Sequence, residues 1–131
     1  MICVDTSAIM AIFLQEPDRE AFRAAIRTAD GLLLSAGSLV ELRIVGTRRN
    51  GPDLVTEIDA FIETYGFQIV PVDAEQAAIA YNAFTRFGKG SGHSAQLNYG
   101  DLFAYALARA RDIPLLYKGD DFAATDISSA L

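Results

Sequence analysis

The sequence has too few histidines and cysteines for several common kinds of active site. His93 is the only histidine and Cys3 the only cysteine among 131 residues. A zinc site with several His or Cys ligands therefore cannot form, and no disulfide can close within the chain. A Ser-His-Asp triad would depend on His93 alone. Because Cys3 lies in an apolar run, we expect a reducing compartment and a cytoplasmic protein.

Positive charge is also scarce. The chain carries 11 Lys and Arg residues against 17 Asp and Glu residues, for a formal net charge of -6. This balance argues against a protein that holds DNA or RNA by bulk neutralisation of phosphates. Any contact with nucleic acid should be local, bridged by a metal, or aided by a partner.

Long apolar runs and the common phosphate and nucleophile motifs are missing as well. The longest apolar run, residues 8–14, is much shorter than the roughly 20 residues of a membrane helix, so we expect no membrane partner. The chain has no Gly-x-Ser-x-Gly elbow, and no phosphate loop ending in Gly-Lys-Ser or Gly-Lys-Thr.

Short apolar runs alternate with segments of helical periodicity. The runs at residues 2–4, 32–34, 67–70 and 115–117 are typical of strands buried on both faces. Between them, apolar residues recur at helical spacing, as in Leu54, Ile58 and Phe61. We therefore predict an α/β fold in one domain over residues 1–131, with a mainly parallel central sheet flanked by helices on both faces.

Turn and capping residues agree with this division. A Gly-Pro pair at 51–52 separates two helices, and Gly66 ends the second. Asp73, with Gln76 three residues later, resembles a capping box that opens a helix running to about residue 87.

Four acidic residues lie in or directly after apolar segments, although they are far apart in sequence: Asp5, Glu41, Asp101 and Asp120. Asp5 and Asp120 follow predicted strands, and ligands of open α/β sheets gather at the carboxyl ends of strands. Asp101 begins a helix, where the helix dipole favours an anion, and Glu41 lies on a helix that otherwise appears buried. We expect the four side chains to converge.

Converging carboxylates repel one another unless they share a cation, and Mg²⁺ or Mn²⁺ suits an all-oxygen set better than Zn²⁺. Such an ion polarises a phosphoryl oxygen and lowers the pKa of bound water, so phosphodiester hydrolysis best uses this set. Taken singly, Asp5 and Asp101 could be helix caps, Asp120 could begin a turn, and Glu41 could pair with an arginine. Four such coincidences together are less plausible.

Four motifs follow one another along the chain in the order found in a known family. They are Ile-Cys-Val-Asp-Thr-Ser-Ala at 2–8, Ser-Leu-Val-Glu at 38–41, Leu-Asn-Tyr-Gly-Asp at 97–101 and Leu-Leu-Tyr-Lys-Gly-Asp-Asp-Phe at 115–122. On these residues the chain resembles, from end to end, the PIN-domain ribonucleases, and in particular the VapC toxins of bacterial toxin-antitoxin pairs.

The resemblance implies an Mg²⁺- or Mn²⁺-dependent endoribonuclease that is silenced by a cognate VapB-like antitoxin and forms a homodimer. It implies that Asp5 and Asp101 are the principal metal ligands and Glu41 a third. The fourth acid is Asp120, which is nearer the strand end, or Asp121, which is the better sequence match. All four are candidate catalytic residues.

Other residues could support this site. Thr6 or Ser7 could orient Asp5 through a hydrogen bond, as metal ligands commonly require. Lys118 adjoins the last acid and could offset its charge. Basic residues could hold RNA or be ordinary surface charges. These candidates are Arg43, Arg48, Arg49, Arg86, Lys89 and Lys118.

Two further hypotheses concern partners and function. Apolar helices around residues 9–14 and 22–26, if exposed, would offer an antitoxin segment a place to bind. The alternative function is a phosphoacceptor signalling domain of the receiver type, for which Asp5 and Lys118 would be suited. Glu41 and Asp101 would have no role in such a domain.

Overall fold

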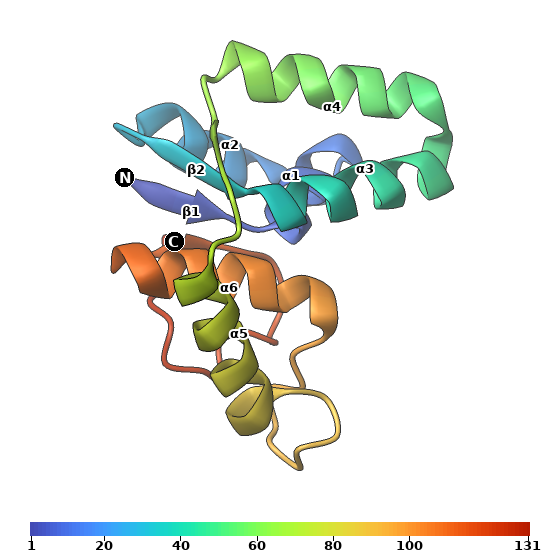
Figure 1. Ribbon diagram of the computed structural model, residues 1–131. Coiled ribbons are helices and arrows are strands. Elements are labelled where there is room, and N and C mark those ends of the chain that lie inside the picture. Colours follow the sequence, from blue (N-terminus) through green and yellow to red (C-terminus); the bar gives the residue numbers. More distant parts are fainter.

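A parallel sheet of four strands forms the centre of the protein, for which a computed structural model describes all residues 1–131. The strands are β1 (Ile2–Val4), β2 (Leu32–Ser35), β3 (Gln68–Val70) and β4 (Leu115–Leu116), and their order is β3-β2-β1-β4. Every pairing is parallel, so all four carboxyl ends meet at one edge, as Figure 1 shows for β1 and β2. The predicted α/β fold with a parallel sheet is confirmed.

Six helices connect and cover the strands. They are α1 (Thr6–Phe13), α2 (Arg19–Thr28), α3 (Ala36–Asn50), α4 (Pro52–Thr64), α5 (Ala74–Phe87) and α6 (Tyr99–Arg111). Pro52 opens α4 directly after Gly51, as the sequence indicates, because proline needs no backbone N–H at that position. No helix has the length and apolar character needed to cross a membrane.

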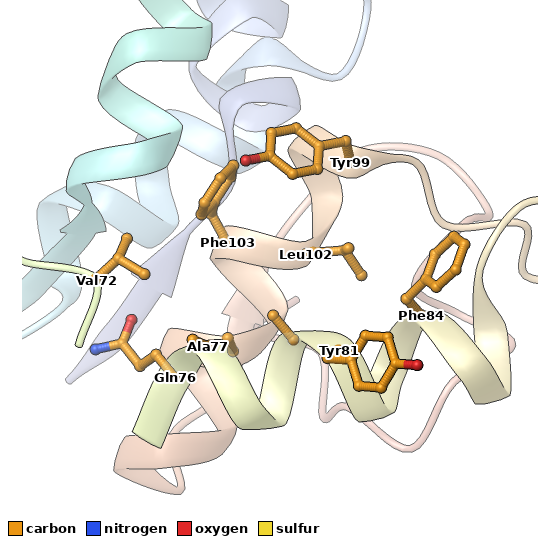
Figure 2. Close-up of a pocket in the computed structure, with 10 residues that line it drawn as sticks. Val72, Gln76, Ala77, Tyr81, Phe84, Tyr99, Leu102 and Phe103 are labelled. Carbon is orange, nitrogen blue, oxygen red and sulfur yellow. The ribbon is translucent and has the colours of Figure 1, made fainter. Parts of the chain in front are cut away.

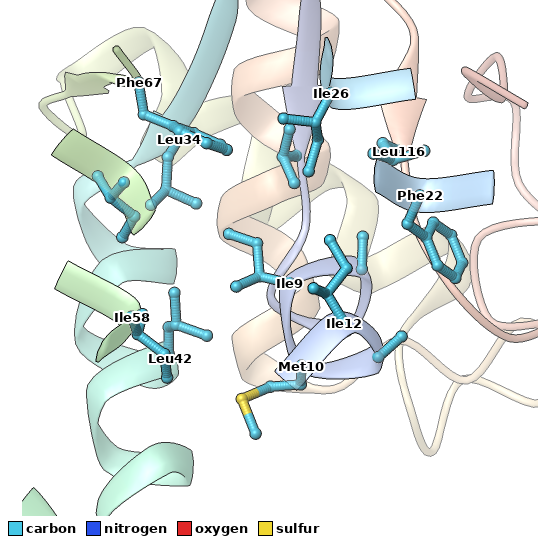
Figure 3. Packing of buried hydrophobic residues seen from close by; sticks show 14 of the residues in the cluster. Ile9, Met10, Ile12, Phe22, Ile26, Leu34, Leu42, Ile58, Phe67 and Leu116 are labelled. Atoms are coloured by element: carbon cyan, nitrogen blue, oxygen red, sulfur yellow. The ribbon is translucent and has the colours of Figure 1, made fainter. Parts of the chain in front are cut away.

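Alternate residues of each central strand enter two separate cores. Val4 and Leu34 belong to a core that also contains Ile9, Phe22 and Ile58, contributed by α1, α2 and α4 (Figure 3). The neighbouring residues, among them Cys3 and Leu33, pack on the other face with α5 and α6. Burying one such Leu, Ile or Phe side chain contributes about 1.5–3 kcal/mol, which fixes the strand register.

The burial of α1 and α2 contradicts the predicted site for an antitoxin. Ile9 is 0% exposed, and Phe22 and Ile26 are each 2% exposed, because these helices turn their apolar faces onto the sheet. The apolar residues of 9–12 and 22–26 are therefore mainly core, and only Phe13 and Leu14 at the end of this stretch stay partly exposed.

The structure differs from two smaller predictions. Gln68 and Ile69 are exposed, because β3 is an edge strand and is not covered on both faces. Asp73 accepts a hydrogen bond from the Gln76 backbone N–H, but the Gln76 side chain donates to the Pro71 carbonyl instead of returning to the cap. The expected capping box is thus only half formed.

Candidate functional site

Asp5 lies at the carboxyl end of the central strand β1 and is also the N-cap of α1. Its side chain is buried, with the residue only 3% exposed. One carboxylate oxygen, Oδ2, accepts hydrogen bonds from the Ser7 backbone N–H and the Ser7 hydroxyl. The other, Oδ1, is buried and has no hydrogen-bond partner. An orphaned buried carboxylate oxygen is costly, and a bound cation would satisfy it.

Ser7 connects Asp5 to the last strand of the sheet. Its hydroxyl donates to Asp5 Oδ2 at 2.6 Å and accepts from the Lys118 backbone N–H at 2.9 Å. The Thr6 hydroxyl does not contact Asp5 and instead donates to the Ser38 carbonyl at the start of α3. Of the two residues predicted to orient Asp5, Ser7 therefore contacts the carboxylate through its side chain.

Asp101 is fixed by a capping box at the start of α6. Its Oδ2 accepts from the Asn98 backbone N–H, and the Asn98 side chain accepts from the Asp101 N–H in return. The capping box occupies only Oδ2. The other oxygen of Asp101, Oδ1, makes no hydrogen bond within the protein and stays available to a ligand. The Asn-x-x-Asp spacing at 98–101 was visible in the sequence as a signal of this geometry.

Glu41 joins the site where α3 and α6 pack very closely against each other. A Cβ atom added to Gly100 would lie 1.5 Å from Glu41 Oε2, so the carboxylate occupies the space that any other residue at position 100 would need. At the same crossing, a Cβ atom on Gly37 would lie 2.4 Å from the Phe103 ring. Sequence reasoning did not single out these two glycines, because nothing in the sequence places α3 beside α6.

Asp121 supplies the fourth negative charge near Asp101. Its charge, like those of Asp5 and Glu41, raises the pKa of Asp101, whereas Asp120 is not among the groups that shift it. Both residues are exposed and follow β4. Asp121 was predicted as the alternative to Asp120, and the electrostatics of the structure favour Asp121. We call Asp5, Glu41, Asp101 and Asp121 the acidic site.

The electrostatics of the acidic site favour cation binding. Burial, with a smaller contribution from the Glu41 charge, raises the pKa of Asp5 from 3.8 to about 6, although the hydrogen bonds from Ser7 lower it. Burial is also the main cause that raises the pKa of Asp101 to about 7, with the three other carboxylates adding to it. None of the ion pairs in the protein involves any of the four acids.

The donor set fits a hard divalent cation, although the four carboxylates do not all touch one point. The site offers only carboxylate oxygens, the ligands that Mg²⁺ and Mn²⁺ prefer, and one of them is the orphaned Asp5 Oδ1. As placed, no three His, Cys, Asp or Glu residues form a ready-made group of metal ligands. Closure around an ion would therefore require rotation of the less buried carboxylates, Glu41 and Asp121.

Two basic residues predicted near the site have other partners. The Lys118 ammonium donates to Asp18 Oδ1 at 2.9 Å and lies 3.4 Å from Glu16 Oε2, beyond the end of α1. These contacts, led by the hydrogen bond to Asp18, raise the pKa of Lys118. Arg43 pairs with Asp59 of α4 at 3.1 Å. The receiver-type alternative is not supported, because Lys118 points to an ion pair rather than to Asp5.

Comparisons with known proteins agree with this geometry. A family described as PIN domain matches residues 2–128. Ribonuclease VapC42 of Mycobacterium tuberculosis is 42% identical over 127 residues, which cover 97% of this chain and 97% of that protein. Ribonuclease VapC28 of the same organism is 45% identical over 128 residues, covering 98% and 96%.

Solved structures share the fold. VapC20 of Mycobacterium tuberculosis, described as a Sarcin-Ricin loop cleaving toxin, aligns with a TM-score of 0.78 at 18% identity, covering 97% of this chain and 96% of that one. VapBC2 from Rickettsia felis, bound to a DNA fragment from their promoter, aligns with a TM-score of 0.75 at 16% identity, covering 98% and 96%. The chain thus belongs to the PIN-domain family and, within it, to the VapC ribonucleases.

Proposed function

We propose that this protein is the toxin of a toxin-antitoxin pair and an endoribonuclease that hydrolyses RNA phosphodiester bonds with Mg²⁺ or Mn²⁺ in the cytoplasm. The observation that carries the proposal is the acidic site itself, four carboxylates gathered from separate parts of the chain without one basic partner. Relatives that are 42% and 45% identical over nearly the whole chain are named ribonucleases.

Each acid has a distinct task in this proposal. Asp5 and Asp101 are the principal ligands, because each keeps one oxygen free while hydrogen bonds fix the other. Glu41 and Asp121 complete the set, and rotation of their less buried side chains would close them on the ion. When bound, the ion would polarise a phosphoryl oxygen and lower the pKa of a bound water. Ser7 and Asn98 hold the two principal carboxylates in position, which limits the reorganisation needed when RNA binds.

Metal-mediated contact also reconciles RNA cleavage with the negative net charge. Four clustered carboxylates would repel phosphate, and a shared divalent ion removes this repulsion only where the reaction takes place. We propose that a VapB-like antitoxin silences the site. Solved structures with this fold include a toxin-antitoxin complex from Klebsiella pneumoniae, with a TM-score of 0.71.

We further propose a homodimer formed through the apolar groove between α5 and α6. This groove has a volume of about 530 Å³, and nine of its ten lining residues are hydrophobic. Figure 2 shows Tyr81 and Phe84 of α5 and Tyr99 of α6 along it, and these side chains are 71%, 45% and 77% exposed. So much exposed aromatic surface is unusual for a monomer. Tyr81→Asp should yield a monomer in sedimentation, and an unchanged mass would contradict this assignment.

The enzymatic proposal is tested with purified, antitoxin-free protein and total cellular RNA. Cleavage should require Mg²⁺ or Mn²⁺, stop in excess EDTA and return when the ion is restored. Asp5→Ala and Asp101→Ala should abolish cleavage while circular dichroism shows an intact fold. Undiminished cleavage in EDTA would refute metal dependence, and full activity of either variant would refute the assigned site.

A further inference from the structure

A polar cleft lies beside α5 and α6, and its lining shares no residue with the acidic site or the apolar groove. It has a volume of about 340 Å³, and its polar lining comes from Asn82 and Arg86 of α5 and from Tyr105 and Arg109 of α6. We call it the basic cleft. The residue Asp126, in the segment that follows β4, lies against the same side chains.

The basic cleft contains more positive than negative charge. Arg86 Nη1 lies 3.6 Å and Arg109 Nη2 lies 4.0 Å from the same oxygen of Asp126, its Oδ2. The other oxygen, Oδ1, accepts from the Tyr105 hydroxyl. The single carboxylate of Asp126 is thus the ion-pair partner of two guanidinium groups, and both contacts are long. Each guanidinium carries five N–H donors, so most of the donors remain free.

The two arginines are also held in place. The Arg86 guanidinium lies over the Phe87 ring, 4.5 Å from its centroid, and Phe87 itself is buried. Arg109 lies in the last turn of α6, and the contact of its guanidinium with Asp126 restrains it. Their side chains are 49% and 45% exposed, so both can meet a ligand from solution. Fixed, half-exposed guanidinium groups match the oxygens of a phosphate better than freely moving surface lysines do.

We propose that Arg86 and Arg109 bind a phosphate of the RNA backbone at a distance from the bond that is cut. This inference rests on the proposed ribonuclease function. Arg109 lies about 12 Å further along the axis of α6 than Asp101, at a rise of about 1.5 Å per residue. A phosphate in the basic cleft would therefore belong to a neighbouring nucleotide, not to the scissile one. Burial and the Asp126 contact raise the pKa of Tyr105 to about 12, so its phenol keeps the single proton that it donates to Asp126.

The basic cleft has a local role in an otherwise acidic protein. Lys118 and Arg43, two other candidates for RNA contact, are each matched by at least one acid. The basic cleft instead leaves one positive charge in excess beside a hollow large enough for a phosphate group. A backbone contact of this kind positions RNA without reading its bases, so it would act on long substrates whatever their sequence.

The experiment compares cleavage of an RNA of about 16 nucleotides with one of about 4 nucleotides, at several salt concentrations and saturating Mn²⁺. Arg86→Gln and Arg109→Gln should raise the KM for the long RNA several-fold more than that for the short RNA. Each should also reduce the slope of log KM against log salt by about 0.7, the value for one lost contact to single-stranded nucleic acid. Arg27→Gln removes the same charge from an exposed arginine of α2 that is in none of the ion pairs, and it should change neither quantity.

Asp126→Asn separates phosphate binding from a merely structural role of the arginines. If they bind phosphate, removing the competing carboxylate should lower the KM for the long RNA. If they only anchor the segment after β4, Asp126→Asn should raise KM as the arginine variants do, which would overturn the proposal. If the slope of log KM against log salt for Arg86→Gln and Arg109→Gln equals that for Arg27→Gln, the proposal is also overturned. The same holds if the two arginine variants lose only antitoxin binding. Failure of the wild-type protein to cut either RNA would instead reject the ribonuclease function.

Discussion

Glu41 and Gly100 share one small volume where α3 crosses α6. The Glu41 carboxylate fills the place of a missing side chain at position 100, 1.5 Å from where a Cβ atom would be. Gly100 lies next to Asp101, so the absence of a side chain there is what allows Glu41 to join the other acids.

Gly100→Ala should therefore separate stability from activity. The new methyl group meets only the end of the flexible Glu41 side chain, which can rotate away, so the melting temperature should change little. Metal affinity and RNA cleavage should fall toward the values for Glu41→Ala. Gly37→Ala is the control, because its methyl group meets the Phe103 ring and should lower the melting temperature. Full cleavage by Gly100→Ala would show that Glu41 is not needed where the structure places it.

Asp121 and Asp120 form a natural pair of test variants. Asp121→Asn should weaken divalent-ion binding and lower the pKa of Asp101, because it removes one of the charges that raise that pKa. Asp120→Asn makes the same chemical change one residue away and should have the smaller effect on both. Metal titrations and NMR titration of the Asp101 carboxyl carbon measure the two quantities. A larger effect from Asp120→Asn would assign the fourth acid to Asp120.

The metal-free protein should lose stability as pH rises from about 4 to about 7. Asp5 and Asp101 bind protons more tightly when folded than when unfolded, since their pKa values are raised to about 6 and about 7. The free energy of unfolding therefore falls through this window and levels off above it. For buried Asp5 the upper limit is on the order of 3 kcal/mol, at 1.36 kcal/mol per pKa unit.

Urea unfolding in EDTA at about pH 4 and about pH 8 measures this loss. Asp5→Asn and Asp101→Asn should each reduce it, and each should be more stable than wild type at the higher pH, because one member of a repulsive group is gone. Variants that are less stable than wild type at the higher pH would contradict convergence of the carboxylates.

Ser7→Ala should loosen Asp5 without removing it. The variant loses the hydroxyl that donates to Asp5 and accepts from the Lys118 N–H. The buried Asp5 carboxylate and the half-buried Lys118 N–H each lose a partner, so we expect a loss of about 1–3 kcal/mol in the free energy of unfolding. The pKa of Asp5 should rise, because the Ser7 hydroxyl is a main cause that lowers it. Ser7→Thr retains the hydroxyl and should restore most of both properties; equal loss in Ser7→Thr would argue against the hydrogen bond as the cause.

Local patterns allowed much of the fold to be predicted. The run at residues 2–4 and the Gly-Pro pair at 51–52 mark a strand and a helix boundary that the structure reproduces. Such signals can be read from the sequence because they depend only on residues that are adjacent in the chain. Burial was harder to infer. The helices around Ile9 and Phe22 were expected to offer an apolar surface, but sequence periodicity cannot tell an apolar face that packs on a sheet from one that stays open.

The acidic site was predicted in outline, and its details depend on tertiary contacts. Asp5, Glu41 and Asp101 stand out because a charge in an apolar segment is unusual. The choice between Asp120 and Asp121 depends on which side chain approaches Asp101, and the turn after β4 determines that. The ion pair of Lys118 with Asp18 joins residues that are distant in sequence, so adjacency to the acids was misleading.

The central claim is that carboxylates from separate parts of the chain bind one divalent ion, and Mn²⁺ binding followed by electron paramagnetic resonance tests it most directly. Titration of the antitoxin-free protein should remove the free-ion signal with defined stoichiometry. Asp5→Asn and Asp101→Asn should each weaken binding by about tenfold or more. Arg27→Gln should bind as wild type does. A wild-type protein that leaves the free Mn²⁺ signal unchanged, or variants at both aspartates that bind with wild-type affinity, would contradict the account.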